Sequence, residues 1–496
     1  MRRDLRARLD AFLGTPIGEV LDGASRTDPE EAVLALFHEV AGDVPAYRQF
    51  LAMHGVAPAE VREIADFKRL PLLNRDNYLG RFPLAERCRG GTLAGLEIIA
   101  MSSGSTGEPT PWPRGLVDEL EIAARFEQVF FDNFEADRRS TLAVVCFPLG
   151  TWIGGMYTAS CCRHLAAKGY SLVTVTPGNQ KPEIYRVVTS LAAGFEQVVL
   201  LGYPPFLKDV IDGGEAAGID WHKLRLGLVL AGEVVSEEWR ALMRERAGLR
   251  RPLHDVVSLY GTADAGVLGN ETPLASAIRG ALARDPDAAR ALFGEARLPT
   301  LVQYDPRSRY FETHERTLLF SGDNGVPLVR YHISDQGGVI GYEDMLDFCR
   351  ARGLDPVAEV AAQGERGVHA LPFAYVFGRS HFAVSFYGAN IFPEMVAIGL
   401  EQPAVSDHVT GKFVMEVVAD ADQGRELRIA VELAEGVRAP AGLRERVAEA
   451  IQASLLRLCS EFAAYAPSAR QLPRVTLLAA RDPAYFPVGV KHRYSR

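Results

Sequence analysis

A run of small hydroxyl and glycine residues is the first feature of this sequence that suggests chemistry. It follows the mostly apolar residues 96–101 and is itself followed by prolines. Glycines let the backbone approach a ligand, successive N–H groups form a concavity for anions, and hydroxyls donate to phosphate oxygens. The run therefore suggests a phosphate-binding loop, although an ordinary solvated loop has a similar composition. Its residues are Ser102, Ser103, Gly104, Ser105, Thr106 and Gly107.

Three further stretches place charged residues at or near the ends of predicted strands. Asp264 follows Tyr260 by four positions, Asp335 precedes a Gly-Gly pair that we expect to form a turn, and Arg379 follows a glycine. Ligands gather at the carboxyl ends of strands in open α/β sheets. These positions are therefore candidates for one common site.

The elements that must position these residues show strand–helix alternation. Short runs rich in Val and Leu predict buried strands, and helical patterns lie between them at 181–193 and 205–217. This order predicts an α/β fold, in which mostly parallel sheets are flanked by helices. Residues 1–66 are predicted to be helical. The predicted strands are 141–147, 171–176, 197–201, 226–231 and 256–260.

The C-terminal part of the chain predicts a smaller unit. An amphipathic helical pattern at 437–466 lies among apolar runs at 413–418, 427–433 and 475–478, which indicates an α+β arrangement. The expected organisation is a large N-terminal domain over residues 1–377 and a small C-terminal domain over residues 378–496.

Length, charge and cysteine content exclude several classes of protein. The chain has 496 residues, 48% of them hydrophobic, and a net charge of -9 with no long basic run, so nucleic acid is not an expected partner. No apolar segment is long enough for a membrane span, and the N-terminus lacks the pattern of a signal peptide. The six cysteines have neither disulfide-framework nor metal-ligand spacing, which fits a reduced, cytoplasmic protein.

Four of these stretches, in this order and spacing, resemble the motifs of the adenylate-forming superfamily, which contains acyl-CoA synthetases and adenylation domains. The likeness is strongest to its phenylacetate–CoA ligase branch. That branch has a Ser-Ser-Gly-Thr-Thr-Gly-Lys-Pro-Thr loop, Tyr-Gly-x-x-Glu, Arg-Tyr-x-x-x-Asp, and Gly-Arg-Ser-Asp-Asp followed by Gly-x-Asn-Ile-Phe-Pro. The likeness also includes 70–78 and 151–159, and it covers roughly residues 65–496. The matching stretches here are SSGSTGEPT, YGTAD, RYHISD and GRSHF with GANIFP.

The resemblance implies an ATP-dependent ligase that uses Mg²⁺ and, as thiol acceptor, coenzyme A. A carboxylate attacks the α-phosphorus of ATP, pyrophosphate leaves, and a thiol then attacks the acyl-adenylate and expels AMP. Both steps develop negative charge, so they need positioned donors and cations. The resemblance further implies that the small C-terminal domain is a mobile lid over the site.

Roles for individual residues follow from the same resemblance. The loop from Ser102 to Gly107 would hold the β- and γ-phosphates, and Asp264 would help bind Mg²⁺. Asp335 would bind the ribose hydroxyls, while Arg379 would contact the ribose or a phosphate and act with Lys491 in catalysis. The residues expected to frame the adenine are Ala231, Gly232, Glu233, Tyr260, Gly261 and Thr262.

Several positions depart from the family's pattern. Glu108 stands where many relatives have lysine, and Asp264 replaces a glutamate. His381 occupies the expected pivot between the half-reactions, where relatives have aspartate; a packed or exposed histidine is the alternative. Lys491, expected to neutralise charge at the α-phosphate, lies one residue out of the family's register, and a solvated terminal lysine is the other interpretation.

The acid and the acceptor are the least determined parts of the prediction. By analogy, Phe147 and Trp152 flank the acyl pocket, and the lack of an obvious basic residue there favours a neutral aromatic or medium-length acid over a dicarboxylate.

Transfer to coenzyme A is the first hypothesis for the function. An adenylating enzyme that uses a carrier-protein thiol, an amine or another nucleophile is the second, and a non-catalytic nucleotide-binding protein is the third. A homodimer and a carrier protein are possible partners; a membrane is not expected.

Overall fold

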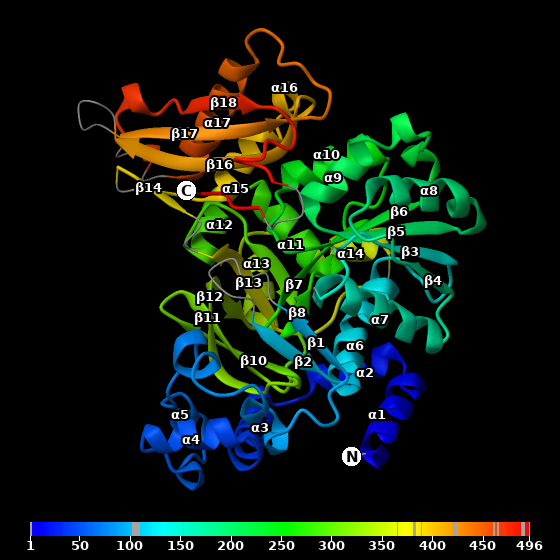
Figure 1. The fold of residues 1–496 in the computed structure, drawn as a ribbon, viewed down its shortest axis with the longest axis vertical. Helices are drawn as coiled ribbons and strands as arrows, with labels where there is room; N and C mark the ends of the chain where they lie inside the picture. Colours follow the sequence, from blue (N-terminus) through cyan, green and yellow to red (C-terminus); the bar gives the residue numbers. More distant parts are fainter. Residues whose placement is uncertain are drawn as a thin grey trace.

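A computed structural model describes residues 2–101, 110–151, 153–364, 366–379, 383–387, 389–419, 425–459, 462–463, 466–487 and 492–495. An eleven-stranded sheet runs through its body (Figure 1). In spatial order the strands are β10 (Arg309–His314), β11 (Thr317–Gly322), β12 (Leu328–Ile340), β13 (Phe373–Arg379), β9 (Thr300–Gln303), β8 (Gly266–Asn270), β7 (Val256–Thr262), β6 (Leu226–Ala231), β5 (Gln197–Gly202), β3 (Thr141–Val145) and β4 (Leu172–Val175).

The sheet has a parallel half and an antiparallel half. From β4 to β7 every neighbouring pair is parallel. From β7 to β10 every neighbouring pair is antiparallel. The five strands predicted from apolar runs form the parallel half, and the α/β fold class is confirmed.

Helices cover both faces of the parallel half because its strands are apolar on both faces. In β3, Leu142 and Val144 join one buried cluster with residues of α8 to α10, while Ala143 and Val145 join another with residues of α6 and α7. Successive side chains of a strand point to opposite faces, so a continuous apolar run requires two layers of helices. The helices of this region are α6 (Leu116–Asp132), α7 (Ile153–Ala167), α8 (Lys181–Leu191), α9 (Pro204–Asp212) and α10 (Glu237–Ala247). Four further helices pack with β9 and β13 of the antiparallel half: α11 (Pro273–Ala283), α12 (Pro286–Phe293), α13 (Tyr342–Arg350) and α14 (Pro356–Gln363).

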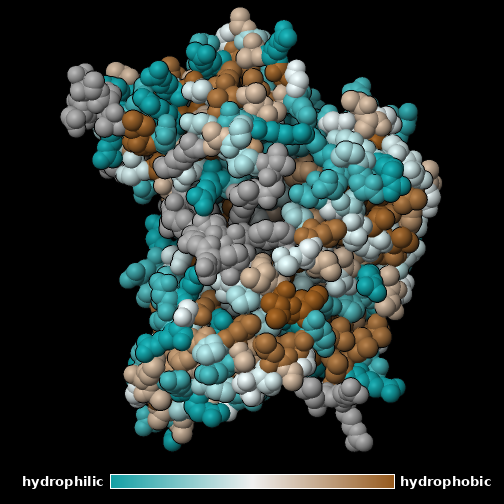
Figure 2. Space-filling model, in the orientation of Figure 1, coloured by the Kyte–Doolittle hydropathy of each residue, from teal (hydrophilic) through white to brown (hydrophobic). Residues whose placement is uncertain are grey.

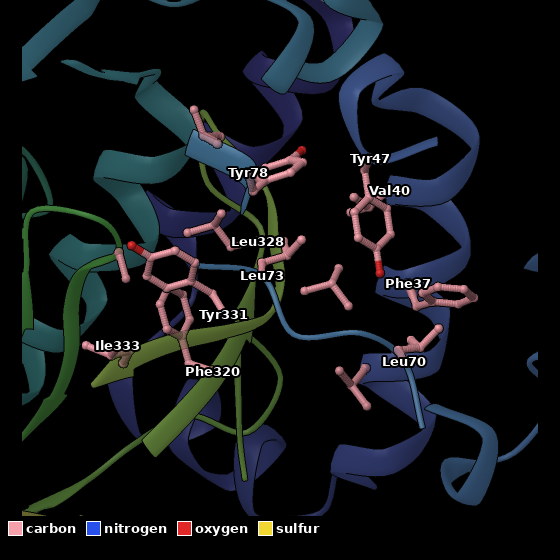
Figure 3. Close-up of a cluster of buried hydrophobic side chains, with 14 of the residues drawn as sticks. Phe37, Val40, Tyr47, Leu70, Leu73, Tyr78, Phe320, Leu328, Tyr331 and Ile333 are labelled. Atoms are coloured by element: carbon pink, nitrogen blue, oxygen red, sulfur yellow. The ribbon is translucent and has the colours of Figure 1, made fainter. Parts of the chain in front are cut away.

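The N-terminal residues are helical, as predicted. Proline occupies the start of α3 and of α4, where a missing N–H costs nothing, and Asp28 caps α3 by accepting from the Glu30 N–H. Phe37 and Tyr47 from these helices pack towards the antiparallel half of the sheet (Figure 3). The helices are α1 (Arg2–Gly14), α2 (Ile17–Ser25), α3 (Pro29–Asp43), α4 (Pro45–Met53) and α5 (Ile64–Phe67).

The same buried cluster fixes the chain after α5 against β12. The Leu73 N–H donates to the Arg330 carbonyl at 3.1 Å, and the His332 N–H donates to the Leu73 carbonyl at 2.8 Å. Leu73 and Tyr78 are fully buried in the cluster with Tyr331 (Figure 3). The segment that follows Leu73 is therefore held in place beside β12.

The C-terminal part has its own buried cluster and small sheets, as the apolar runs predicted. Gly399 is required where two of its helices, α15 and α17, meet, since a Cβ there would lie 2.6 Å from the Ile451 Cα. The predicted boundary at residue 377 falls within β13, the last strand of the large sheet. The elements after it are β14 (Val384–Phe386), β15 (Ala389–Ile391), α15 (Pro393–Leu400), α16 (Pro403–Ser406), β16 (Val409–Ala419), β17 (Arg425–Leu433), α17 (Leu443–Leu458) and β18 (Arg474–Leu478).

The surface mixes hydrophilic and hydrophobic side chains on the face shown in Figure 2. Among the described residues, none of the helices has the length and apolar character needed to cross a membrane.

Candidate active site

A cleft of about 580 Å³ opens beside the carboxyl ends of β6 and β7. Its size is in the range usual for small-molecule sites. It lies where the α/β pattern predicted, because parallel strands end at the same edge of a sheet. The residues that line it include Thr110, Trp112, Gly232, Glu233, Tyr260, Gly261, Thr262, Asp264, Tyr331 and Asp335.

The predicted phosphate loop connects two paired strands at this cleft. β1 (Ile98–Met101) and β2 (Pro111–Arg114) form an antiparallel pair, and residues 102–109 join them. The loop itself lies outside the described residues. Thr110 and Trp112, which follow it in the sequence, line the cleft.

Tyr260 and Asp335 are joined by a hydrogen bond in which the phenol donates to the Asp335 carboxylate at 2.8 Å. Both residues are almost buried, with 7% and 6% of their surfaces exposed. Their strands, β7 and β12, stand four places apart in the sheet, which is roughly 19 Å in a flat sheet at about 4.8 Å per strand. The antiparallel half must therefore curl until β12 faces β7.

The Gly-Gly pair after Asp335 does not form the expected turn. β12 continues to Ile340, and the pairing with β13 shifts in register between Gln336 and Gly337. A Cβ on Gly337 would lie 2.1 Å from the Tyr375 carbonyl oxygen, so only glycine fits this close approach. Such irregularities re-aim neighbouring side chains.

Arg379 is brought next to Asp335 by strand pairing. The two residues are register partners at the end of the β12–β13 ladder. The Arg379 side chain is outside the described part of the structure, and its contact with a nucleotide remains a prediction.

Glu233 is held by two phenols from distant parts of the chain. Its carboxylate accepts hydrogen bonds from Tyr203, after β5, and from Tyr494, in the C-terminal tail. Burial and the nearby Glu233 carboxylate raise the pKa of Tyr494 well above its usual value, so the phenol remains a donor. Gly232 precedes Glu233 with φ +97°, a conformation that favours glycine.

The C-terminal tail reaches the cleft. The Met415 N–H of β16 donates to the Tyr494 carbonyl at 2.7 Å, and the His492 Nε2–H donates to the Phe413 carbonyl at 2.7 Å. Burial lowers the pKa of His492. His492 and Tyr494 both line the cleft. Lys491 lies outside the described residues, but its next neighbour in the sequence stands at the site.

Asp264 offers a carboxylate to the cleft from the turn between β7 and β8. Among the described residues no three His, Cys, Asp or Glu side chains are arranged to hold a metal ion. Mg²⁺ usually retains water and binds one or two carboxylates together with substrate phosphates, so one Asp at this cleft fits this ion.

The remaining predicted residues stay predictions. Ala231 ends β6 next to the lining residue Gly232. Phe147 is 8% exposed within the buried cluster around β3 and α7. Trp152 and His381 lie outside the described residues.

Sequence reasoning missed one wall of the cleft. Asn74, Arg75 and Asp76 line it, as do Trp112 and Tyr331. The first three occur in a stretch noted only for its likeness to the family. The signal that could have found Tyr331 is alternation, because it lies four residues before Asp335 on the same strand. Trp112 lies five residues after the predicted loop, beyond any predicted strand.

Comparisons with known proteins agree with this arrangement. A phenylacetate–coenzyme A ligase of Aromatoleum evansii is 24% identical over 365 residues, which are 71% of this chain and 70% of that protein. A 2-hydroxyisobutyryl-CoA ligase, in the postadenylation state with its acyl-AMP, matches with a TM-score of 0.67 and 15% identity, over 94% of this chain and 89% of that one. The same ligase with CoA in the thioesterification state gives a TM-score of 0.50 at 16% identity, with the same coverage. No family model matches the sequence.

The fold is that of the adenylate-forming ligases, and the chain is similar in sequence to phenylacetate–coenzyme A ligases. The phenylacetate–CoA ligase-like character inferred from its motifs agrees with the curated relatives. The structural similarity to the hydroxyisobutyryl-CoA ligase extends through both the large sheet and the C-terminal elements, because it covers 94% of the chain.

The predicted role of Asp335 can be tested by the variant Asp335→Ala. If the carboxylate binds ribose hydroxyls, the change removes charge-assisted hydrogen bonds of about 1.5–3 kcal/mol. Calorimetry should then show ATP affinity lower by roughly one to two decades. Asp137→Ala, which removes a carboxylate paired with Arg366 at 2.7 Å outside the cleft, should leave ATP affinity unchanged. Normal ATP affinity with an early melting transition would make Asp335 a structural residue only.

Proposed function

We propose that the protein activates a carboxylic acid with ATP as an acyl-adenylate and transfers the acyl group to coenzyme A. The single observation that carries this proposal is the cleft, where Tyr260 and Asp335 meet beside the phosphate-loop hairpin and the C-terminal tail. The ligases to which the chain is similar support the same reaction class.

In the first half-reaction a carboxylate oxygen bonds to the α-phosphorus, and the bond to the pyrophosphate oxygen breaks. Asp335 would orient the ribose, and the 102–107 loop would hold the departing phosphates through backbone N–H groups and hydroxyls. Lys491 would stabilise charge that grows at the phosphorus. Mg²⁺, held by Asp264 and phosphate oxygens, would neutralise phosphate charge.

In the second half-reaction the thiol sulfur bonds to the acyl carbon, AMP leaves, and the thiol proton is released. The tail that lines the cleft would have to withdraw to admit the thiol. We therefore propose residues 1–377 as the domain that binds ATP and acid, and residues 378–496 as a lid that rotates between the steps. The higher TM-score with the postadenylation state than with the thioesterification state supports this assignment.

The contacts that such a rotation would break are polar. Tyr494 donates to Glu233, Ser236 donates to Glu401, and Arg457 pairs with Glu238 at 3.0 Å. Burial raises the pKa of Glu401 to about 7. Polar contacts can be exchanged for water at small net cost, which suits an interface that opens.

An aromatic acid is the favoured substrate class. Trp112 and Tyr331 are buried at the cleft, where flat rings can pack against an aryl tail. The class of acid can be tested directly with a panel of candidate substrates.

ATP–pyrophosphate exchange over a panel of aryl, alkyl and dicarboxylic acids tests the proposed reaction. Exchange should be fastest with a neutral aromatic acid, and CoA should be consumed as AMP appears. Exchange without CoA consumption would assign another acceptor, such as an amine or a carrier-protein thiol. If no acid supports exchange or AMP release, the protein binds nucleotide without this chemistry.

Lys491→Ala should slow acyl-adenylate formation by about 10²–10³, the usual loss for one preorganised charged donor. ATP affinity and melting temperature should barely change, because the contact forms in the transition state. Thioester formation from synthetic acyl-adenylate should be spared. An equal loss in both half-reactions would show that the lid does not alternate, and no loss in either would reduce Lys491 to a terminal charge.

Tyr494→Phe tests whether the tail contact holds the lid for the first half-reaction. Removing one hydrogen bond to the Glu233 carboxylate should slow adenylation roughly tenfold, equivalent to about 1.4 kcal/mol, and leave thioester formation unchanged. Tyr203→Phe is the matched control, since it removes the other phenol on Glu233 but leaves the lid contact. The same slowing in both variants would attribute the effect to Glu233 itself rather than to the lid.

A further inference from the structure

Two buried guanidinium groups hold three consecutive carbonyls in the turn that carries Asp264. Arg114 donates from one nitrogen to the carbonyl oxygens of Ala263 and Asp264, both at 2.8 Å. Arg309 donates to the next carbonyl oxygen, that of Ala265, at 3.2 Å. The turn between β7 and β8 is therefore fixed through its main chain by residues from elsewhere in the sequence.

These arginines are among the most buried charges of the described chain. Arg114 is 1% exposed and Arg309 is 4% exposed. A buried arginine is normally paired with carboxylates, because an unpaired charge is costly to bury. Arg309 has Glu121 at 3.7 Å and Arg114 interacts electrostatically with Asp118, but the hydrogen bonds that the structure describes for Arg114 all end on carbonyl oxygens. The buried charge of Arg114 therefore serves to fix the turn at 263–265.

The position of Arg114 links two parts of the proposed site. It ends β2, the strand that follows the 102–109 segment, and it lies two residues beyond Trp112, which lines the cleft. Residues two apart on a strand share a face. One side chain thus connects the hairpin that carries the phosphate loop with the turn that carries Asp264.

A second contact stiffens the same turn from within. The Ala265 N–H donates to the Thr262 hydroxyl at 3.2 Å. With the carbonyls of 263–265 bound to the arginines, the backbone of the turn has little freedom left, while Asp264 itself still lines the cleft. These contacts therefore fix the position of Asp264 at the cleft.

We propose that Arg114, assisted by Arg309, is a positioning residue that holds Asp264 at the cleft, where it would bind Mg²⁺ together with ATP. This rests on the proposed function, in which Asp264 binds the Mg²⁺ of Mg–ATP. Arg114 does not itself contact the metal or the nucleotide in this account. It acts through the shape of the turn.

Arg114→Lys is the informative variant, because lysine keeps the charge but lacks the rigid, planar guanidinium that places one nitrogen between both carbonyls. Calorimetric titration of ATP over a series of Mg²⁺ concentrations, without acid, measures binding with no turnover. The Mg²⁺ concentration that gives half-maximal enhancement of ATP affinity should rise about tenfold in the variant. ATP affinity without divalent cation should be unchanged, and amide hydrogen exchange at 263–266 should be faster.

Arg125→Lys is the matched control. Arg125 is also buried, donates to Gln128 at 3.0 Å and lies 3.6 Å from Asp305, and its described contacts do not include the 263–265 turn. It should leave the Mg²⁺ dependence as in the wild type. Should Arg114→Lys fail to fold, Arg309→Lys must show the same shift in Mg²⁺ dependence, to a smaller degree.

Three outcomes would overturn the inference. An unchanged Mg²⁺ dependence in a folded Arg114→Lys variant would remove the positioning role and leave the proposed function standing. An equal loss of ATP affinity with and without Mg²⁺ would make Arg114 a general structural residue. A wild-type protein whose ATP binding ignores Mg²⁺ would overturn both this inference and the assignment of Asp264.

Discussion

The hydrogen bond between Tyr260 and Asp335 requires the large sheet to curl, and the cleft depends on that curl. Tyr260 belongs to the last parallel strand, whereas Asp335 lies on the far side of three intervening antiparallel strands. Only a strongly bent sheet brings both side chains to one place. The buried cluster that includes Tyr260, Val302 and Tyr331 fills the inside of the bend and stabilises it through the burial of apolar surface.

The parallel half of the fold was predictable, and the antiparallel half was much less so. Strands such as β5 are buried on both faces, so their sequences read as continuous apolar runs. β10 and β12 mix polar and apolar residues and contain irregular positions, such as Ser334 at φ +67°. Regular alternation of polar and apolar residues is lost at such a position. The sequence therefore predicted that the strand ends at Asp335, whereas β12 continues past Gly337, which packs against the Tyr375 carbonyl.

The site shows the same division between what local sequence encodes and what tertiary structure decides. Tyr260 and Asp335 could be assigned from short motifs, because each motif carries its own residue to a strand near the cleft. The contacts of Glu233 with Tyr203 and Tyr494 join parts of the chain that no local pattern relates. The hydrogen bonds from Arg114 and Arg309 to three consecutive carbonyls also join distant parts of the chain, so no local sequence pattern predicts them.

The central claim is that one cleft holds the acyl-adenylate between β7, β12 and the C-terminal tail. A crystal structure with a non-hydrolysable acyl-adenylate analogue tests it most directly. The account predicts the ribose hydroxyls within hydrogen-bonding distance of the Asp335 carboxylate, with the phosphate mimic towards the 102–107 loop. Density for the analogue elsewhere, for example in the larger groove of about 1820 Å³ between α9 and β17, would contradict it.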